Sequence, residues 1–83
     1  MKSYTECFED LKDDPLSAAE CIHCLQKHGE VVLFSDEKKR LILWREEFDN
    51  YPVPFMEKIS QLLEIHTRDD YEKMDKKFNL TMY

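Results

Sequence analysis

The chain contains a single glycine and no long apolar run, and both shortages exclude whole classes of protein. Its 83 residues include one glycine, three prolines and three cysteines. One glycine excludes a glycine-rich loop that cradles phosphate, and no apolar run approaches the roughly 20 residues that span a bilayer. Residues 1–4 lack the apolar segment of a signal peptide. We therefore expect a cytoplasmic protein that has no membrane partner.

Signs of catalysis are also scarce. The three histidines have no serine or cysteine at a recognisable nucleophile turn. Paired carboxylates such as Asp13-Asp14 resemble cap residues more than an acid–base couple, which needs a desolvated cleft. Cys21 and Cys24 lack the preceding strand that a thioredoxin-like motif requires. The sequence predicts a protein that is not an enzyme and needs no cofactor.

Charge is abundant and mainly negative. The chain has 18 acidic and 12 basic residues, a net charge of −6, which disfavours broad attraction to nucleic acid or anionic membrane. An acidic cluster near the start leaves two alternatives, a solvated helix face or a surface that mimics a polyanion, as phage-type DNA-mimic inhibitors do. The cluster consists of Glu6, Glu9, Asp10, Asp13 and Asp14.

Local signals predict a small α+β domain over residues 1–83. Thr5 and Asp14 are N-cap candidates for two helices, and Gly29 stands where a helix end needs a left-handed residue. Thr67 is a cap candidate for the last helix. We expect a central antiparallel hairpin packed between helices, in the order α-α-β-β-α-α. The predicted helices cover 6–12, 16–28, 46–51, 54–66 and the stretch after 67, and the predicted strands cover 31–34 and 40–44.

Both arms of the hairpin are apolar at consecutive positions. A strand sends alternate side chains to opposite faces, so a second apolar set points away from the chain's own core. In 83 residues the expected cover is another protein chain, and we predict a homodimer. The residues predicted for self-association are Val32, Phe34, Leu41, Leu43 and Trp44.

An apolar stripe with helical spacing follows the proline break at residues 52–54. It has two interpretations, a surface that lies in a groove on a target protein or a face that packs over the hairpin. Under the first, residues 1–51 form the helix–hairpin core and residues 52–83 serve partner binding. The stripe consists of Phe55, Ile59, Leu62, Leu63, Tyr71, Met74 and Phe78.

The cysteines offer the strongest chemical signal. Cys21, Cys24 and His28 lie one turn apart in succession on one helix face, and Cys7 could complete a tetrahedral zinc site. The same face is the apolar side of the helix, where cysteine behaves as a small hydrophobe. We expect buried thiols and no metal.

Short motifs over residues 2–51 resemble the prevent-host-death (Phd/YefM) antitoxins. The opening Ser-Tyr-Thr-Glu-Cys-Phe-Glu-Asp-Leu run of residues 3–11 is similar to that family's strand-to-helix pattern, and residues 29–34 and 41–51 are similar to its apolar hairpin and following helix. The resemblance implies a sheet-based homodimer, DNA binding by the N-terminal region and a C-terminal segment that folds onto a toxin. Phe8 replaces the family's basic residue, and the hairpin loop 35–40 lacks its glycine.

These observations predict an antitoxin-like or inhibitor-type binding protein that neutralises a target protein, a toxin or another enzyme, by occlusion. Two alternatives remain open, a dimeric operator-DNA-binding regulator and a DNA mimic or small zinc-binding module. The regulator would contact phosphates through Lys38, Lys39, Arg40 and Arg45.

Overall fold

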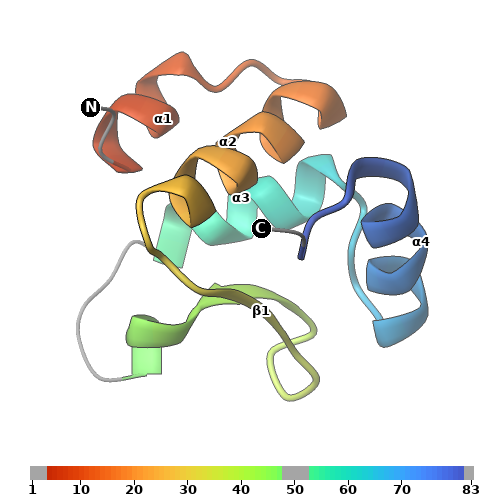
Figure 1. The fold of residues 1–83 in the computed structure, drawn as a ribbon. Coiled ribbons are helices and arrows are strands. Elements are labelled where there is room, and N and C mark those ends of the chain that lie inside the picture. The colour runs from red at the N-terminus through yellow and green to blue at the C-terminus, as the bar shows by residue number, and fades with distance from the viewer. Residues whose placement is uncertain (1–3, 48–52, 82–83) are drawn as a thin grey trace.

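The computed structural model describes residues 4–47 and 53–81 and has the expected α+β class (Figure 1). Its two strands form one antiparallel sheet, in which Leu33 lies opposite Ile42. A short 3-10 helix follows the hairpin. The elements are α1 (Tyr4–Asp10), α2 (Pro15–Lys27), β1 (Val32–Ser35), β2 (Arg40–Leu43), η1 (Trp44–Glu47), α3 (Val53–Leu62) and α4 (Arg68–Phe78).

The boundaries of α2 are those that the sequence predicts. Asp14 is the N-cap, and its Oδ1 accepts a hydrogen bond from the Ser17 N–H at 2.7 Å. Gly29, one residue beyond the C-cap, has φ +88°, where a side chain would be strained. In contrast, α1 begins at Tyr4, so Thr5 lies inside the helix and the prediction that it caps the helix is wrong.

Replacing Asp14 by alanine is expected to lower the free energy of unfolding by about 1 kcal/mol, because the Ser17 N–H loses its acceptor. Asp13→Ala is the matched control. Its carboxylate meets Lys58 Nζ at 3.0 Å, but both side chains are exposed and such pairs contribute little. Urea unfolding measures the free energy of unfolding of both variants. Equal losses of stability would show that the Asp14 cap contributes no more than the exposed ion pair of Asp13.

The two C-terminal helices are separated by a turn that the sequence does not reveal. Glu64 adopts a left-handed conformation, φ 55°, so α3 ends at Leu62 rather than at residue 66. Thr67 caps α4 as predicted, since its hydroxyl accepts from the Asp70 N–H at 3.1 Å. The predicted helix over 46–51 overlaps η1, and its residues 48–51 lie outside the described part of the chain.

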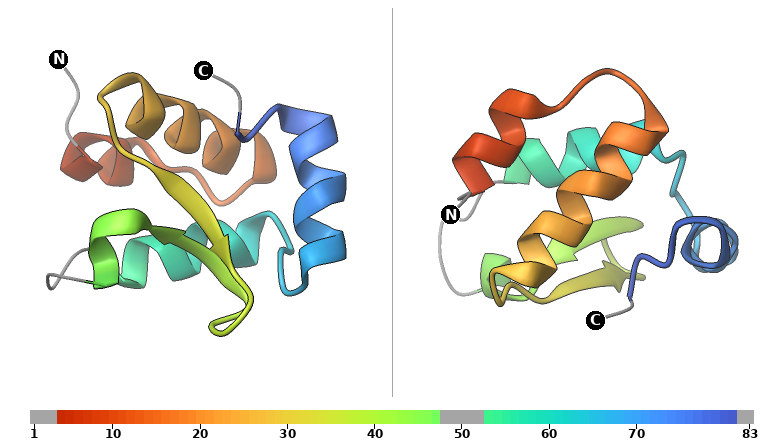
Figure 2. Two further views of the ribbon diagram at one scale, coloured as in Figure 1. Left: turned by 60° about the horizontal axis from the view of Figure 1, so that its bottom comes forward. Right: turned by 45° about the horizontal axis from the view of Figure 1, so that its top comes forward.

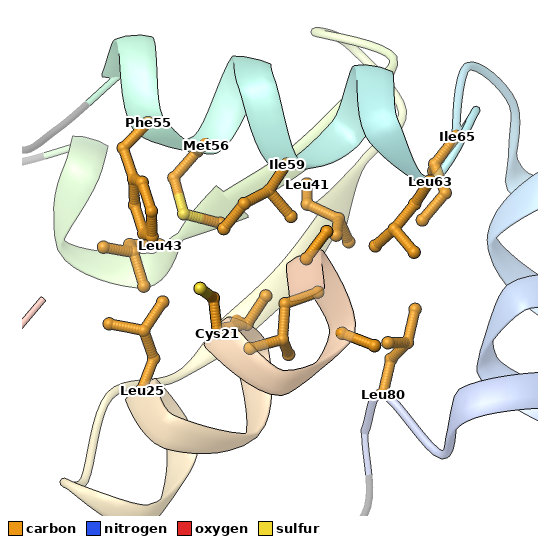
Figure 3. Packing of buried hydrophobic residues seen from close by; sticks show 14 of the residues in the cluster. Cys21, Leu25, Leu41, Leu43, Phe55, Met56, Ile59, Leu63, Ile65 and Leu80 are labelled. Carbon is orange, nitrogen blue, oxygen red and sulfur yellow. The ribbon is translucent and has the colours of Figure 1, made fainter. Parts of the chain in front are cut away.

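The core lies between α2, α3 and the inner face of the hairpin. Side chains from these elements and from the segment after α4 point toward one another (Figure 3). Ser60 joins α3 to β2, because its hydroxyl donates to the Met56 carbonyl and accepts from the Leu41 N–H, both at 2.9 Å. The largest fully buried side chains are Phe55, Ile22, Leu25, Leu41, Leu43, Met56, Ile59, Leu63, Ile65 and Leu80.

The hairpin forms an outer layer rather than the central layer that the sequence suggested. In the described residues α2 contacts β1 and α3 contacts β2 (Figure 2). The helices of residues 4–47 and 53–81 stand on one side of the hairpin, and none of them covers its other face (Figure 2). This arrangement places the candidate functional surface.

Candidate functional site

The register of the hairpin sorts its apolar side chains into an inner and an outer set. Val32, Phe34, Leu41 and Leu43 face the helices and are 0–8% exposed. The prediction that these four residues mediate self-association is therefore wrong, because they fill the chain's own core. Trp44, the fifth residue predicted for that role, is 51% exposed.

The outer face of the hairpin consists of Val31, Leu33, Ile42 and Trp44. Leu33 and Ile42 lie opposite each other in the ladder, and the Trp44 N–H donates to the Val31 carbonyl at 2.9 Å, so the four residues form two adjacent cross-strand pairs. Val31 and Leu33 are 38% and 40% exposed, whereas Ile42 is 4% exposed. Three large, partly exposed apolar side chains thus surround a buried one.

A buried carboxylate anchors the end of the hairpin. Glu46 on η1 has a side chain only 1% exposed, and Arg40 donates to both of its oxygens. The Leu43 N–H also donates to Glu46, at 3.3 Å, and Lys38 Nζ lies 3.5 Å from its Oε1. Burial raises the pKa of Glu46, but the hydrogen bond and charge of Arg40, with Leu43 and Lys38, outweigh burial and hold this pKa below its ordinary value.

This cluster affects the predicted DNA contacts. Arg40 and Lys38 direct their charges to Glu46, which weakens them as phosphate ligands. Lys39 and Arg45 are exposed, and Lys39 has a left-handed backbone with φ 56° in the hairpin loop. The structure therefore does not gather these four basic residues into one surface of free cations.

The hairpin loop is tied to α4. Arg68 donates to both carboxylate oxygens of Asp36, at 2.7 and 3.3 Å, and this hydrogen bond lowers the pKa of Asp36. The Arg68 guanidinium also lies 4.9 Å from the centre of the Phe34 ring, which stacks on Tyr71. These contacts hold α4 against the end of β1.

The predicted target-binding stripe serves the core instead. Four of its seven members are buried, because α3 packs along β2 and Tyr71 of α4 joins the same core cluster. The remaining members are partly buried and pack against the same cluster. We therefore correct the interpretation of residues 52–83 as a partner-binding segment. The buried members are Phe55, Ile59, Leu63 and Tyr71, and the partly buried members are Leu62, Met74 and Phe78.

Three of the four proposed zinc ligands meet where α1 contacts α2. The Sγ atoms of Cys7 and Cys24 are 2.6 Å apart, and the Cys21 thiol donates to the Cys7 carbonyl at 3.1 Å. His28 is the C-cap of α2, one turn beyond Cys24. Within residues 4–47 and 53–81, no group of three or more histidine, cysteine or acidic side chains is placed to hold a metal ion.

The acidic cluster is divided between surface and local structure. Glu6, Glu9 and Asp10 are exposed on α1, whereas Asp14 caps α2 and Asp13 pairs with Lys58. Its interpretation as a polyanion mimic stays a prediction.

Comparisons with known proteins add no family to this picture. No protein-family model matches the chain, and neither the curated proteins nor the solved structures contain a match. The resemblance to the prevent-host-death antitoxins stays a prediction. Among the described residues, every helix is too short or too polar to span a membrane.

Proposed function

We propose that the protein is a non-enzymatic protein-binding module and that the outer face of its hairpin binds a second copy of the same chain. The observation that carries this proposal is the exposure of Val31, Leu33 and Trp44 around Ile42, on a hairpin face that no helix of the described part of the chain covers. Contiguous exposed apolar side chains of this kind mark interaction surfaces.

The apolar composition of this face supports a second copy of the chain as the partner. None of its four side chains is charged, so the complementary surface must also be apolar. A second copy presents such a surface, and a two-fold arrangement places the same residues on both sides of the contact. A chain of 83 residues buries a limited share of its own surface, so association adds stability that the monomer lacks.

The neutralisation of a target protein, whether a toxin or another enzyme, rests on the sequence resemblance and remains a prediction. Operator binding has less support, because the net charge is −6 and two of the four proposed phosphate contacts pair with Glu46. The outer face is the surface on which a heterologous protein would compete with the second copy.

Light scattering coupled to size exclusion tests the self-association. The wild-type chain is expected to approach twice its 10.1 kDa mass as the loading concentration rises from about 10 to about 500 µM, since so small a face supports modest affinity. Leu33→Asp is expected to raise the dissociation constant at least about tenfold, because a carboxylate would be desolvated at the contact.

The matched control is Leu16→Asp. Leu16 is 60% exposed, more than Leu33, but it lies in the first turn of α2, outside the hairpin. The Leu16→Asp variant should dimerise like the wild type, and circular dichroism should show that both variants fold. A wild-type mass that stays at 10.1 kDa over the whole range, or equal weakening by both substitutions, would overturn the proposal.

A further inference from the structure

The contact between α1 and α2 contains a thiol pair that the proposed function does not use. Cys7 projects from α1 and Cys24 from α2, and their Sγ atoms are 2.6 Å apart. A disulfide bond is about 2.05 Å long, so a shift of about half an ångström would bring the two sulfurs to bonding distance. All three cysteines of the chain are thiols in this structure.

The two sulfurs differ in their access to solvent. Cys7 is 2% exposed, whereas Cys24 is only partly buried. A small cavity of about 70 Å³ opens beside them, lined by the three cysteines, Ser17 and the carboxylates of Asp10 and Glu20. A water molecule takes about 30 Å³ of liquid, so the cavity admits a molecule the size of hydrogen peroxide. Glutathione disulfide is far larger and anionic, and the carboxylates oppose its entry.

We propose that Cys24 and Cys7 form a peroxide-reactive thiol pair, with Cys24 as the attacking thiol and Cys7 as the resolving thiol. The Cys24 thiolate attacks one peroxide oxygen, the O–O bond breaks, and the departing hydroxide takes up a proton to leave as water. Cys24 is then a sulfenic acid. The Cys7 thiolate attacks the Cys24 sulfur, the S–O bond breaks, and a second water leaves. Two thiols and one peroxide thus give one disulfide and two waters.

Cys21 is excluded from the pair by its orientation. Its thiol donates to the Cys7 carbonyl at 3.1 Å, and it is 5% exposed. Its thiol is thus directed to the backbone of α1, and Cys21 has no part in the proposed reaction.

The disulfide would fasten a peripheral helix. Among the described elements α1 packs mainly against α2 and stands apart from the hairpin (Figure 1). A disulfide between Cys7 and Cys24 closes a covalent loop of the chain, which contains the Asp13-Asp14-Pro15 turn. We expect oxidation to raise the melting temperature, because the loop is constrained in the unfolded chain.

The test treats the reduced full-length chain with one equivalent of hydrogen peroxide and follows its intact mass. The wild type is expected to lose about 2 Da, the two hydrogens of a disulfide, without forming a covalent dimer. Cys21 and Cys24 lie in the same tryptic peptide, residues 13–27, so the mass of the linked peptides does not distinguish them. Cysteine variants therefore identify which thiol is linked to Cys7. Cys21→Ala should still lose about 2 Da, whereas Cys24→Ala should not.

Cys7→Ala gives the sharpest outcome. Without the resolving thiol, Cys24 should stop at the sulfenic acid, which adds about 16 Da and reacts with dimedone. Circular dichroism establishes that each variant is folded. A disulfide that forms in Cys24→Ala, a wild-type chain that links only between molecules, or a wild-type chain that keeps its mass would each overturn the proposal.

Discussion

Replacing Leu63 by alanine is expected to lower the free energy of unfolding by about 3 kcal/mol or more, a large fraction of the total stability of an 83-residue domain. Leu63 is 1% exposed and lies close to Ile65 and Leu80 in the core (Figure 3). Alanine would leave a cavity there, and the cost is the lost burial together with the lost contacts of the cavity wall.

Leu16→Ala makes the identical chemical change at a site that is 60% exposed. Its effect should stay within about 0.5 kcal/mol. Urea unfolding of the two variants also tests whether the predicted target-binding stripe belongs to the core. If Leu63→Ala left the stability unchanged, the burial of Leu63 would be wrong and its interpretation as a target-binding residue would return.

Replacing Glu46 by alanine is expected to cost about 3 kcal/mol, since the variant leaves Arg40 without its counter-ion and the Leu43 N–H without its acceptor. The Arg40 side chain is 14% exposed, so water compensates only in part. Glu37→Ala, in the exposed hairpin loop, is the control and should change little. Equal unfolding midpoints for the two variants would rule out the anchoring role of Glu46.

The contribution of Glu46 should depend on pH in a defined direction. Its pKa in the folded chain is below the ordinary value of 4.5, so the folded state favours the ionised form. The stabilisation is therefore fully present above pH 4.5 and is lost as the pH falls through the folded pKa. The stability gap between the wild type and Glu46→Ala should narrow in acid, and a gap that widened would contradict the assignment.

The helix boundaries that could be predicted are those set by local chemistry. Asp14 and Thr67 cap helices because a short polar side chain reaches the N–H groups of the following turn, and Gly29 ends a helix because it lacks a β-carbon. The end of α3 could not be predicted, because Glu64 adopts a left-handed conformation that its residue type does not favour. Tertiary packing decides that turn.

Which face of the hairpin is exposed could not be predicted from the sequence. Alternation along β1 and β2 shows that two apolar sets exist, but both sets contain large aliphatic residues. Only the positions of α2 and α3 decide which set is buried. Glu46 was missed for a similar reason, since η1 brings it back to Arg40, six residues earlier, by a turn without a sequence signature.

The two edges of the hairpin differ in a way that limits how copies of the chain can assemble. On the outer edge of β2, the Leu41 N–H is occupied by Ser60 and the Leu43 N–H by Glu46, both from the chain itself. Amyloid growth needs strands that accept a neighbour on either side. Because the outer N–H groups of β2 are occupied, a further strand can pair only with the edge of β1. Two copies paired through their β1 strands would leave no available edge for a third copy. The side chains of Ser60 and Glu46 thus block one edge of the hairpin against the addition of a further strand.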